Sequence, residues 1–384
     1  MPSKPQYYNP SRTQDYSDPA SMVMIDLLLK SGKNDKSWDL LQYISDLNRG
    51  FIPDDVLFKL AGVDNLNDLE EILDPLIRCS LATRLEDHNG QTGLIMDHFV
   101  PGSTKRFMRK YKSITFSDKE IQTKLIEAFY EVLCNATTTW LNLNSGYFFD
   151  NLMHFFGGID FDNLLIEDKD YLKKLSSLLK ETGNYNFDLA PGLKSVYKKS
   201  SEFYEQALEL DSKVNGDDIV ENTPENRTFY NNLGFTYFKL GSSERGLYYL
   251  KKALDFYEEI PSIRFGLEYS TCLKNIGLCY EDLENKSKAL KYYKKSHEAF
   301  TNIVEGKHSF TLDKEGFYKY KKVKSTIKEI ASKIEEIEVD IQNNTDQIPD
   351  DNIITSDNDN SKLIDNDGEE EPSLVGNLPV PEEI

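Results

Sequence analysis

Apolar residues in the second half of the chain recur at helical spacing, and one block of this pattern occurs twice. A Leu-Gly-x-x-Tyr block starts at Leu233, and an Ile-Gly-x-x-Tyr block starts 43 residues later at Ile276. Small residues let two helix backbones approach closely, while large apolar residues fill the rest of the groove between them. The pattern therefore predicts stacked helical hairpins, because one hairpin cannot bury its apolar face alone.

The same spacing continues on both sides of the two blocks. Tyr204 and Ala207 precede Leu250 and Ala253 by 46 residues, which predicts a half-repeat upstream. Downstream, the segment 317–340 keeps apolar residues at helical spacing but lacks the Leu-Gly pair, so we expect a capping helix with a polar outer face. The residues predicted to pack the repeats together are Tyr230, Leu233, Gly234, Tyr237, Gly246, Ala253, Ile276, Gly277, Tyr280 and Ala289.

The N-terminal half has a different pattern, in which three short amphipathic helices precede a hairpin of two strands. The Asn89-Gly90 pair is the strongest hairpin signal in the chain. Three helices and a hairpin in this order make a winged helix. A further helix is expected over Ser103–Tyr111, with Ser103 as its N-cap and a basic cluster over Lys105–Lys112. The predicted helices are Trp38–Leu47, a short one through Val56, Leu57 and Leu60, and Leu66–Ser80, and the predicted strands are Leu81–Leu85 and Gly93–His98.

Length and charge are those of a soluble protein with several domains. The chain has 384 residues, a net charge of −20 and no run of 18 apolar residues. Residues 341–384 hold twelve acidic side chains against one lysine, which predicts a disordered acidic tail. The N-terminus lacks the pattern of a secretion signal, so a cytoplasmic location is expected. The expected domains are a disordered N-terminus at 1–22, a winged-helix-like module at 23–115, a helical linker at 116–149, helical repeats with a capping helix at 150–340, and the tail.

Residues with catalytic or metal-binding chemistry do not form a recognisable motif. The five histidines are scattered, and neither His-Glu-x-x-His nor Gly-x-Ser-x-Gly occurs. Cys272 and Cys279 lie seven residues apart on one helix face, which is too far for a disulfide and typical of buried small residues. The segment starting at Asp357 does not fit a calcium-binding loop, because Lys362 stands where glycine is needed and Gly368 where glutamate is needed. We therefore expect no enzyme activity, no metal and no cofactor.

A winged helix raises the alternative of nucleic-acid binding, and the charges argue against it. The third helix of this fold normally enters the major groove. Here the segment Leu66–Ser80 carries four acidic residues and one arginine, so phosphates would repel it. The basic cluster at Lys105 lies beyond the wing, where it can touch a DNA backbone but not read bases. The simpler interpretation of this cluster is a solvated helix face.

The two glycine blocks resemble the tetratricopeptide repeat, whose pattern is a large residue, Leu-Gly, Tyr, and then Ala, an aromatic residue or Leu, and Ala. Tyr230, Leu233, Gly234 and Tyr237 match this pattern. The 43-residue period and the Asn-Asn-Leu-Gly run ending at Gly234 are similar to the longer variant found in kinesin light chains. The resemblance implies a mainly α fold, in which a winged-helix-like module is followed by a superhelical array of about three hairpins.

The N-terminal half resembles the winged-helix segment of NB-ARC type signal-transduction ATPases. The similar residues are Phe51-Ile52-Pro53, Leu73-x-x-Leu76 and Met96-Asp97-His98-Phe99-Val100, where the family has Met-His-x-Leu-Val at the end of the wing. In bacterial and fungal members a helical linker and long tetratricopeptide repeats follow. This chain has no Gly-x-x-x-x-Gly-Lys-Ser/Thr loop, so the resemblance implies the regulatory part without the ATPase domain.

The inner helices of such an array predict a peptide-binding groove. Asn232 and Asn275 stand at equivalent positions, and in the long-variant family such asparagines hydrogen-bond the backbone of an extended peptide. The alternative is that both amides only bond a neighbouring helix. The groove does not resemble the carboxylate clamp of chaperone cofactors, which needs several lysines and arginines. The predicted peptide-binding residues are Asn231, Asn232, Phe235, Lys239, Lys274, Asn275 and Leu278.

The expected function is a non-enzymatic adaptor or scaffold that binds an extended segment of a partner protein. Neither a membrane nor a nucleic acid is expected as its main partner, and the oligomeric state stays open. Two alternatives remain: a winged-helix regulator linked to nucleic acid, and a signalling subunit whose acidic tail occupies its own groove.

Overall fold

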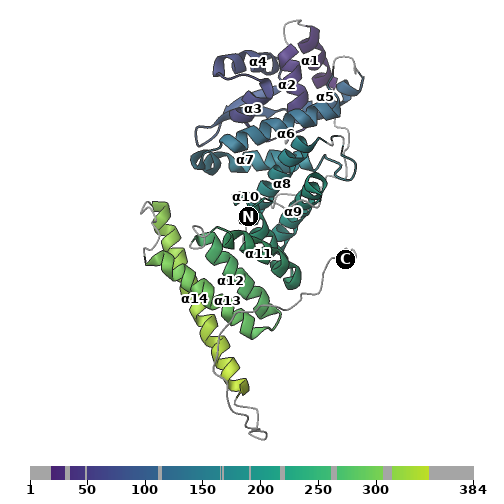
Figure 1. The fold of residues 1–384 in the computed structure, drawn as a ribbon. Coiled ribbons are helices and arrows are strands. Elements are labelled where there is room, and N and C mark those ends of the chain that lie inside the picture. Colours follow the sequence, from purple (N-terminus) through teal and green to yellow (C-terminus); the bar gives the residue numbers. More distant parts are fainter. Residues whose placement is uncertain are drawn as a thin grey trace, which may run out of the picture. The chain divides into compact units, whose positions relative to one another are not determined.

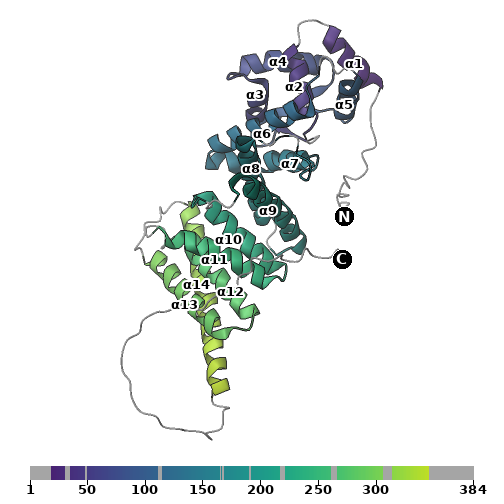
Figure 2. The same ribbon diagram turned by 45° about the vertical axis from the view of Figure 1, so that its right-hand side comes forward.

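The computed structural model describes residues 19–30, 35–47, 50–110, 115–164, 166, 168–189, 192–216, 221–260, 266–305 and 314–345. Most of these residues are helical, so the fold is mainly α, as predicted (Figure 1 and Figure 2). Most of the two predicted disordered ends, 1–22 and 341–384, lies outside the described residues.

The first elements form a unit in which helices pack around a three-stranded antiparallel sheet of order β1-β3-β2. The three predicted helices and the hairpin are present, and Ala82 pairs with Met96 across the hairpin. Strand β1 was not predicted, because two residues are too few to show an alternating pattern. The elements are α1 (Pro19–Lys30), α2 (Asp35–Ile44), β1 (Ile52–Pro53), α3 (Asp54–Ala61), α4 (Leu66–Arg78), β2 (Ala82–Glu86) and β3 (Thr92–Met96).

Arg84 on β2 holds two helices against this sheet. Its guanidinium donates to both carboxylate oxygens of Asp54, the first residue of α3, and its Nε donates to Glu70 Oε1 on α4 at 2.9 Å. Thr92 Oγ1 on β3 donates to Asp54 Oδ2 at 2.6 Å. The Arg84 and Asp54 side chains are only 20% and 10% exposed. This bidentate ion pair is therefore partly shielded from solvent and is stronger than an ion pair on the surface.

Helix α5 (Val100–Lys110) begins three residues before the predicted start. Ser103 is therefore not its N-cap but a fully buried residue inside the helix, which corrects the prediction. Pro101 explains the earlier start, because proline fits the first turn of a helix, where its missing N–H costs nothing. The ring of Phe107 packs edge-on against Trp38 of α2, with 5.5 Å between centroids.

Two longer helices, α6 (Asp118–Asn135) and α7 (Thr138–Phe156), occupy the place of the predicted linker. Helix α6 starts at a capping box, in which Ser117 and Glu120 satisfy each other's backbone N–H groups. Helix α7 continues across the predicted domain boundary at residue 149. Asn151 Nδ2 on α7 donates to the backbone oxygen of Phe51 at 3.0 Å, so α7 is fastened to the start of β1.

Among the described residues after 168, the helices form three hairpins and one last long helix. In each hairpin the two helices pack along their length. The three hairpins follow one another through contacts of α9 with α10 and of α11 with α12. The helices are α8 (Lys169–Leu189), α9 (Lys194–Asn215), α10 (Pro224–Lys239), α11 (Ser243–Glu258), α12 (Leu267–Asp282), α13 (Lys286–Val304) and α14 (Lys314–Thr345).

A glycine on the first helix of every hairpin touches a large side chain of the second helix. In all three places an added Cβ would lie within 2.4–2.7 Å of that side chain, which is closer than real Cβ contacts. At Gly234 the obstacle includes backbone, because the carbonyl oxygen of Gly246 lies 2.7 Å from the Cβ position. The pairs are Gly183 with Tyr204, Gly234 with Leu250, and Gly277 with Tyr293.

A hydrogen bond between α9 and α10 joins the first hairpin to the second. Tyr237 of α10 donates its hydroxyl to Glu205 Oε1 of α9 at 2.6 Å, and the guanidinium of Arg245 lies 4.1 Å from the Tyr237 ring centroid. Within the first hairpin, Lys180 Nζ lies 2.9 Å from Asp211 Oδ2. The Lys180 side chain is 7% exposed, so its ammonium is buried as a paired charge, the condition under which such burial is tolerated.

Helix α14 lies against the last hairpin, which it contacts through α12 and α13. Val323, Ile330 and Ile337 are buried at seven-residue intervals. Lys333 Nζ lies 2.7 Å from both carboxylate oxygens of Glu281 at the end of α12. Lys294 Nζ of α13 lies 2.7 Å from Glu338 Oε1 of α14.

The glycine contacts give the first testable prediction. Gly234→Ala should destabilise the protein by about 2–3 kcal/mol, because its Cβ would lie 2.6 Å from Leu250 Cγ and cannot avoid the backbone behind it. Gly146→Ala is the matched control, since its Cβ would meet the Tyr185 hydroxyl at an ordinary 3.7 Å. Alanine is the better helix former, so this control should gain about 0.5–1 kcal/mol. Urea unfolding measures both, and a loss of stability of similar size in both variants would contradict the assigned contact.

Candidate functional site

The residues predicted to bind a peptide lie on α10 and α12, the first helices of two hairpins. Asn231 and Asn275 are 8% and 4% exposed. Asn232, Phe235, Lys274 and Leu278 are half-buried, and Lys239 is exposed at the end of α10. The structure therefore divides the predicted set into two buried amides and five side chains that reach a surface.

The asparagine amides form hydrogen bonds between neighbouring helices. Asn275 Nδ2 of α12 donates to Asn231 Oδ1 of α10 at 3.3 Å. Asn232 Nδ2 donates to Asn184 Oδ1 of α8 at 3.0 Å, and the Tyr204 hydroxyl donates to the same oxygen at 2.8 Å. These bonds match the alternative interpretation, in which the asparagines join adjacent helices. Contact of these amides with a peptide stays a prediction, for which Asn232 has the more exposed side chain.

An aromatic cluster surrounds Phe235. The ring of Phe187, near the end of α8, lies 5.9 Å from Phe235, and the ring of Phe238 lies 5.8 Å from it, centroid to centroid. Lys239 Nζ sits 5.0 Å from the Phe235 centroid and 5.3 Å from the Phe238 centroid. Phe187 and Phe238 are half-buried and were not among the predicted site residues. Each stands four residues after its hairpin glycine, which is the signal that identifies them.

Lys274 on α12 interacts electrostatically with lysines of two other helices, one of them Lys239 beside this cluster. Burial lowers the pKa of Lys274, and the ammonium groups of Lys239 and Lys322 lower it further, while the Glu329 carboxylate acts in the opposite direction. Burial raises the pKa of Asp188 at the end of α8, and Lys322 opposes that shift. Lys322 belongs to α14, far from the repeats' own motifs in sequence.

The arrangement offers two kinds of contact to a ligand. Half-exposed phenylalanine rings can cover an apolar side chain, and ammonium groups beside them can pair with carboxylates. Lys274 is half-buried, whereas Lys239 and Lys322 are exposed, so a ligand carboxylate can reach their ammonium groups.

The N-terminal unit gives α4 an acidic outer surface. Asp68 and Glu71 on α4 are exposed, and Arg78 Nε lies 2.8 Å from Asp74 on the same helix. Of the basic residues on α5, Lys105 pairs with Asp46. Weak DNA affinity stays a prediction, and this charge pattern agrees with it.

Other candidate chemistry is limited in the part of the chain that the structure describes. Within the described ranges no three His, Cys, Asp or Glu residues lie together as a metal site would require. Burial raises the pKa of the Cys272 and Cys279 thiols, which disfavours the reactive thiolate. No helix among the described residues has the length and apolar character to cross a membrane.

Antiparallel helix pairs that stack through glycine contacts define a helical-repeat protein. Residues 225–302 match the family model of the tetratricopeptide repeat, and this segment of the chain consists of tetratricopeptide repeats. It contains α11 and α12 and nearly all of α10 and α13. The pair α8 and α9 lies before the matched segment and has the same glycine contact. Tetratricopeptide repeats indicate a protein–protein interaction scaffold.

Two solved structures are similar over longer stretches at low sequence identity. One is BtubC (BKLC) from P. vanneervenii, with 18% identity over 68% of this chain and 95% of that one, and a TM-score of 0.33. The other is a Signal Transduction ATPase with Numerous Domains protein with a tetratricopeptide repeat sensor from Pyrococcus horikoshii. It shows 13% identity over 85% of this chain and 54% of that one, with a TM-score of 0.26. No curated protein matched the sequence.

Lys274 provides a stability test of the lysine cluster. Lys274→Met should raise the unfolding free energy by about 1 kcal/mol, because it removes a half-buried charge and keeps the apolar stem. The native pKa lies below the ordinary 10.5, so the wild type bears the charge penalty at neutral pH and loses it as pH rises toward 10.5. The advantage of the variant should therefore shrink over that alkaline range. Lys291→Met, at an exposed position on α13, should change little at any pH. Urea unfolding at neutral and alkaline pH measures both variants, and a destabilised Lys274→Met would contradict the assigned penalty.

Proposed function

We propose that this protein is a non-catalytic scaffold that binds an extended segment of a partner protein on the surface formed by α8, α10, α12 and α14. The supporting observation is the convergence of Phe187, Phe235 and Phe238 with three lysines from α10, α12 and α14. Binding by tetratricopeptide repeats accounts for this convergence without requiring a catalytic group.

The chemistry of this surface favours a segment that carries carboxylates next to a large apolar side chain. The lysine ammonium groups pair with the carboxylates, and the half-buried rings cover the apolar side chain. Asn232 is placed to hydrogen-bond the backbone of the segment, because its amide can both donate and accept. Asn231 and Asn275 then act indirectly, by fixing α10 against α12. The surface is small, so we expect modest affinity.

We infer that the N-terminal unit from α2 to β3 is a winged helix, from its order of helix, strand, two helices and hairpin. The acidic residues on α4 favour a protein contact over a DNA contact for this unit. Its resemblance to the winged helix of NB-ARC ATPases supports a role in positioning the repeats within a larger signalling assembly.

Peptide binding tests the proposed surface directly. Fluorescein-labelled 12-residue peptides that combine glutamates with one phenylalanine should raise the fluorescence anisotropy with full-length protein at micromolar concentrations. Lys239→Met and Lys274→Met should each weaken binding by about tenfold, the effect of losing about 1.4 kcal/mol. Lys291→Met should bind like the wild type. Because Lys274→Met is expected to be at least as stable as the wild type, its loss of binding would not come from unfolding.

Peptides in which lysine replaces glutamate are the ligand control. Equal binding of acidic and basic peptides, or equal binding by the Lys274→Met and Lys291→Met variants, would contradict the proposed surface. Binding of neither peptide class would contradict the proposed ligand chemistry.

The acidic tail of the same chain has the ligand chemistry that this surface favours. If the tail competes for the lysines, a chain that ends at Thr345 should bind the acidic peptide several-fold more tightly than the full-length chain. High salt should reduce the difference between the two chains, because the competition is electrostatic. Equal affinities at low salt would exclude the tail as a competitor.

A further inference from the structure

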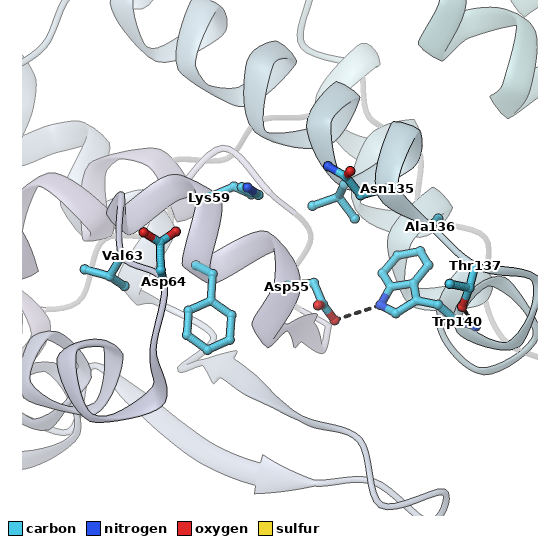
Figure 3. A pocket seen from close by; sticks show the side chains of 10 residues that line it. Asp55, Lys59, Val63, Asp64, Asn135, Ala136, Thr137 and Trp140 are labelled. Atoms are coloured by element: carbon cyan, nitrogen blue, oxygen red, sulfur yellow. Dashed lines mark hydrogen bonds between the residues drawn. The ribbon is translucent and has the colours of Figure 1, made fainter.

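A second candidate binding place lies in the N-terminal half, away from the repeats. A cavity of about 280 Å³ opens between α3 and the junction of α6 with α7. Figure 3 shows Lys59, Val63 and Asp64 on one side, Asn135, Ala136 and Trp140 on the other, and Asp55 between them. A volume of this size holds one long side chain but not a folded element.

The walls combine aromatic rings with carboxylates. Phe58 and Trp140 line the cavity, and both are half-buried, so part of each ring remains accessible. Trp140 Nε1 donates to Asp55 Oδ2 at 2.7 Å (Figure 3). This bond fixes the indole and the carboxylate relative to each other, and a carboxylate can accept further donors at its remaining lone pairs.

Lys59, the basic residue of the cavity wall, forms an ion pair with a residue of α6. Lys59 Nζ lies 3.1 Å from Glu131 Oε2 on α6, so Lys59 pairs with Glu131 and not with Asp55. Asp64, in the connection after α3, adds a second exposed carboxylate. The wall charges, with Glu131 counted, therefore favour a positively charged ligand. In the described part of the chain no three His, Cys, Asp or Glu side chains are grouped as a metal site would require, which argues against a metal ion.

We propose that this cavity binds an arginine side chain of a partner protein. A guanidinium group is planar, stacks on aromatic faces and donates to carboxylates in a fixed fork, so the Trp140 indole and the Asp55 carboxylate bonded to it offer both kinds of contact in one wall. A lysine ammonium would use the same charges but not the flat ring faces. The net charge of −20 attracts basic partners to the whole molecule, and this cavity adds a specific place for one side chain.

Tryptophan fluorescence gives a direct test, because the chain has two tryptophans and the other, Trp38, is 4% exposed. Full-length protein is titrated with the capped tripeptide acetyl-Gly-Arg-Gly-amide, and with the same peptide carrying citrulline, the neutral analogue of arginine. The arginine peptide should change the emission saturably in the millimolar range, and the citrulline peptide should not.

Two aspartate variants and one control locate the effect. Asp55→Asn and Asp64→Asn should each lower the affinity for the arginine peptide at least fivefold. Glu71→Gln removes one exposed negative charge from α4, outside the cavity, and should leave the affinity unchanged. Thermal unfolding checks that all three variants fold. The lysine-cluster variant Lys274→Met should also bind the arginine peptide normally, so this test is independent of the repeat surface.

Several results would overturn the proposal. A fluorescence response that is absent, or equal for arginine and citrulline, would show that the cavity does not recognise the guanidinium. Equal weakening by Glu71→Gln and Asp64→Asn would assign the binding to diffuse attraction by the acidic chain.

Discussion

The contact between a glycine and a large side chain determines the arrangement of the repeats. In each hairpin the first helix gives up a side chain so that the second helix can lie against its backbone. Close packing makes this contact specific in position, since neither helix can shift along the other without a clash. The rotation of the first helix is then fixed, and with it the side chains that reach the ligand surface. Phe235 adjoins Gly234, and Lys274 stands one turn before Gly277. The candidate site is therefore a consequence of backbone packing.

Sequence patterns predicted the contacts that depend on local spacing. The hairpins around Gly234 and Gly277 and the helices and strand hairpin of the N-terminal unit followed from periodicity and turn residues. The prediction that Ser103 is an N-cap was wrong. It relied on the Ser103 hydroxyl, whereas Pro101 is the better marker of a helix start. Gly183 was missed because it precedes Gly234 by 51 residues instead of 43, so a constant period does not find it.

The charge cluster could not be predicted in the same way. Lys239, Lys274 and Lys322 belong to three helices, and no motif links them in sequence. Their proximity appears only when α14 is placed along the last hairpin. The hydrogen bonds of Asn232 and Asn275 were open for a similar reason, since an amide at one position suits either a peptide or a neighbouring helix. Which partner an amide contacts depends on tertiary packing, and the spacing of residues in the sequence carries no information about that packing.

The structure separates two opposite electrostatic environments on one strongly acidic chain. Lysines gather on the repeat helices, whereas carboxylates and rings line the cavity beside α3. Both environments sit where helices from distant parts of the sequence meet, so each depends on the fold for its charge density. A chain with evenly mixed charges would have neither.

The unequal spacing of the glycines has a consequence for how such arrays change over evolutionary time. The partners Gly183 and Tyr204 are 21 residues apart, whereas the corresponding pairs at Gly234 and Gly277 are separated by 16 residues. The connection grows only from three residues to four, so most of the extra residues lie in the two helices between the contact and the turn. An insertion of about one helical turn brings side chains back to the same helix face, so the glycine contact can be kept. The helix ends next to the turn are therefore places where about one turn can be inserted while the packing of the hairpin is inherited unchanged.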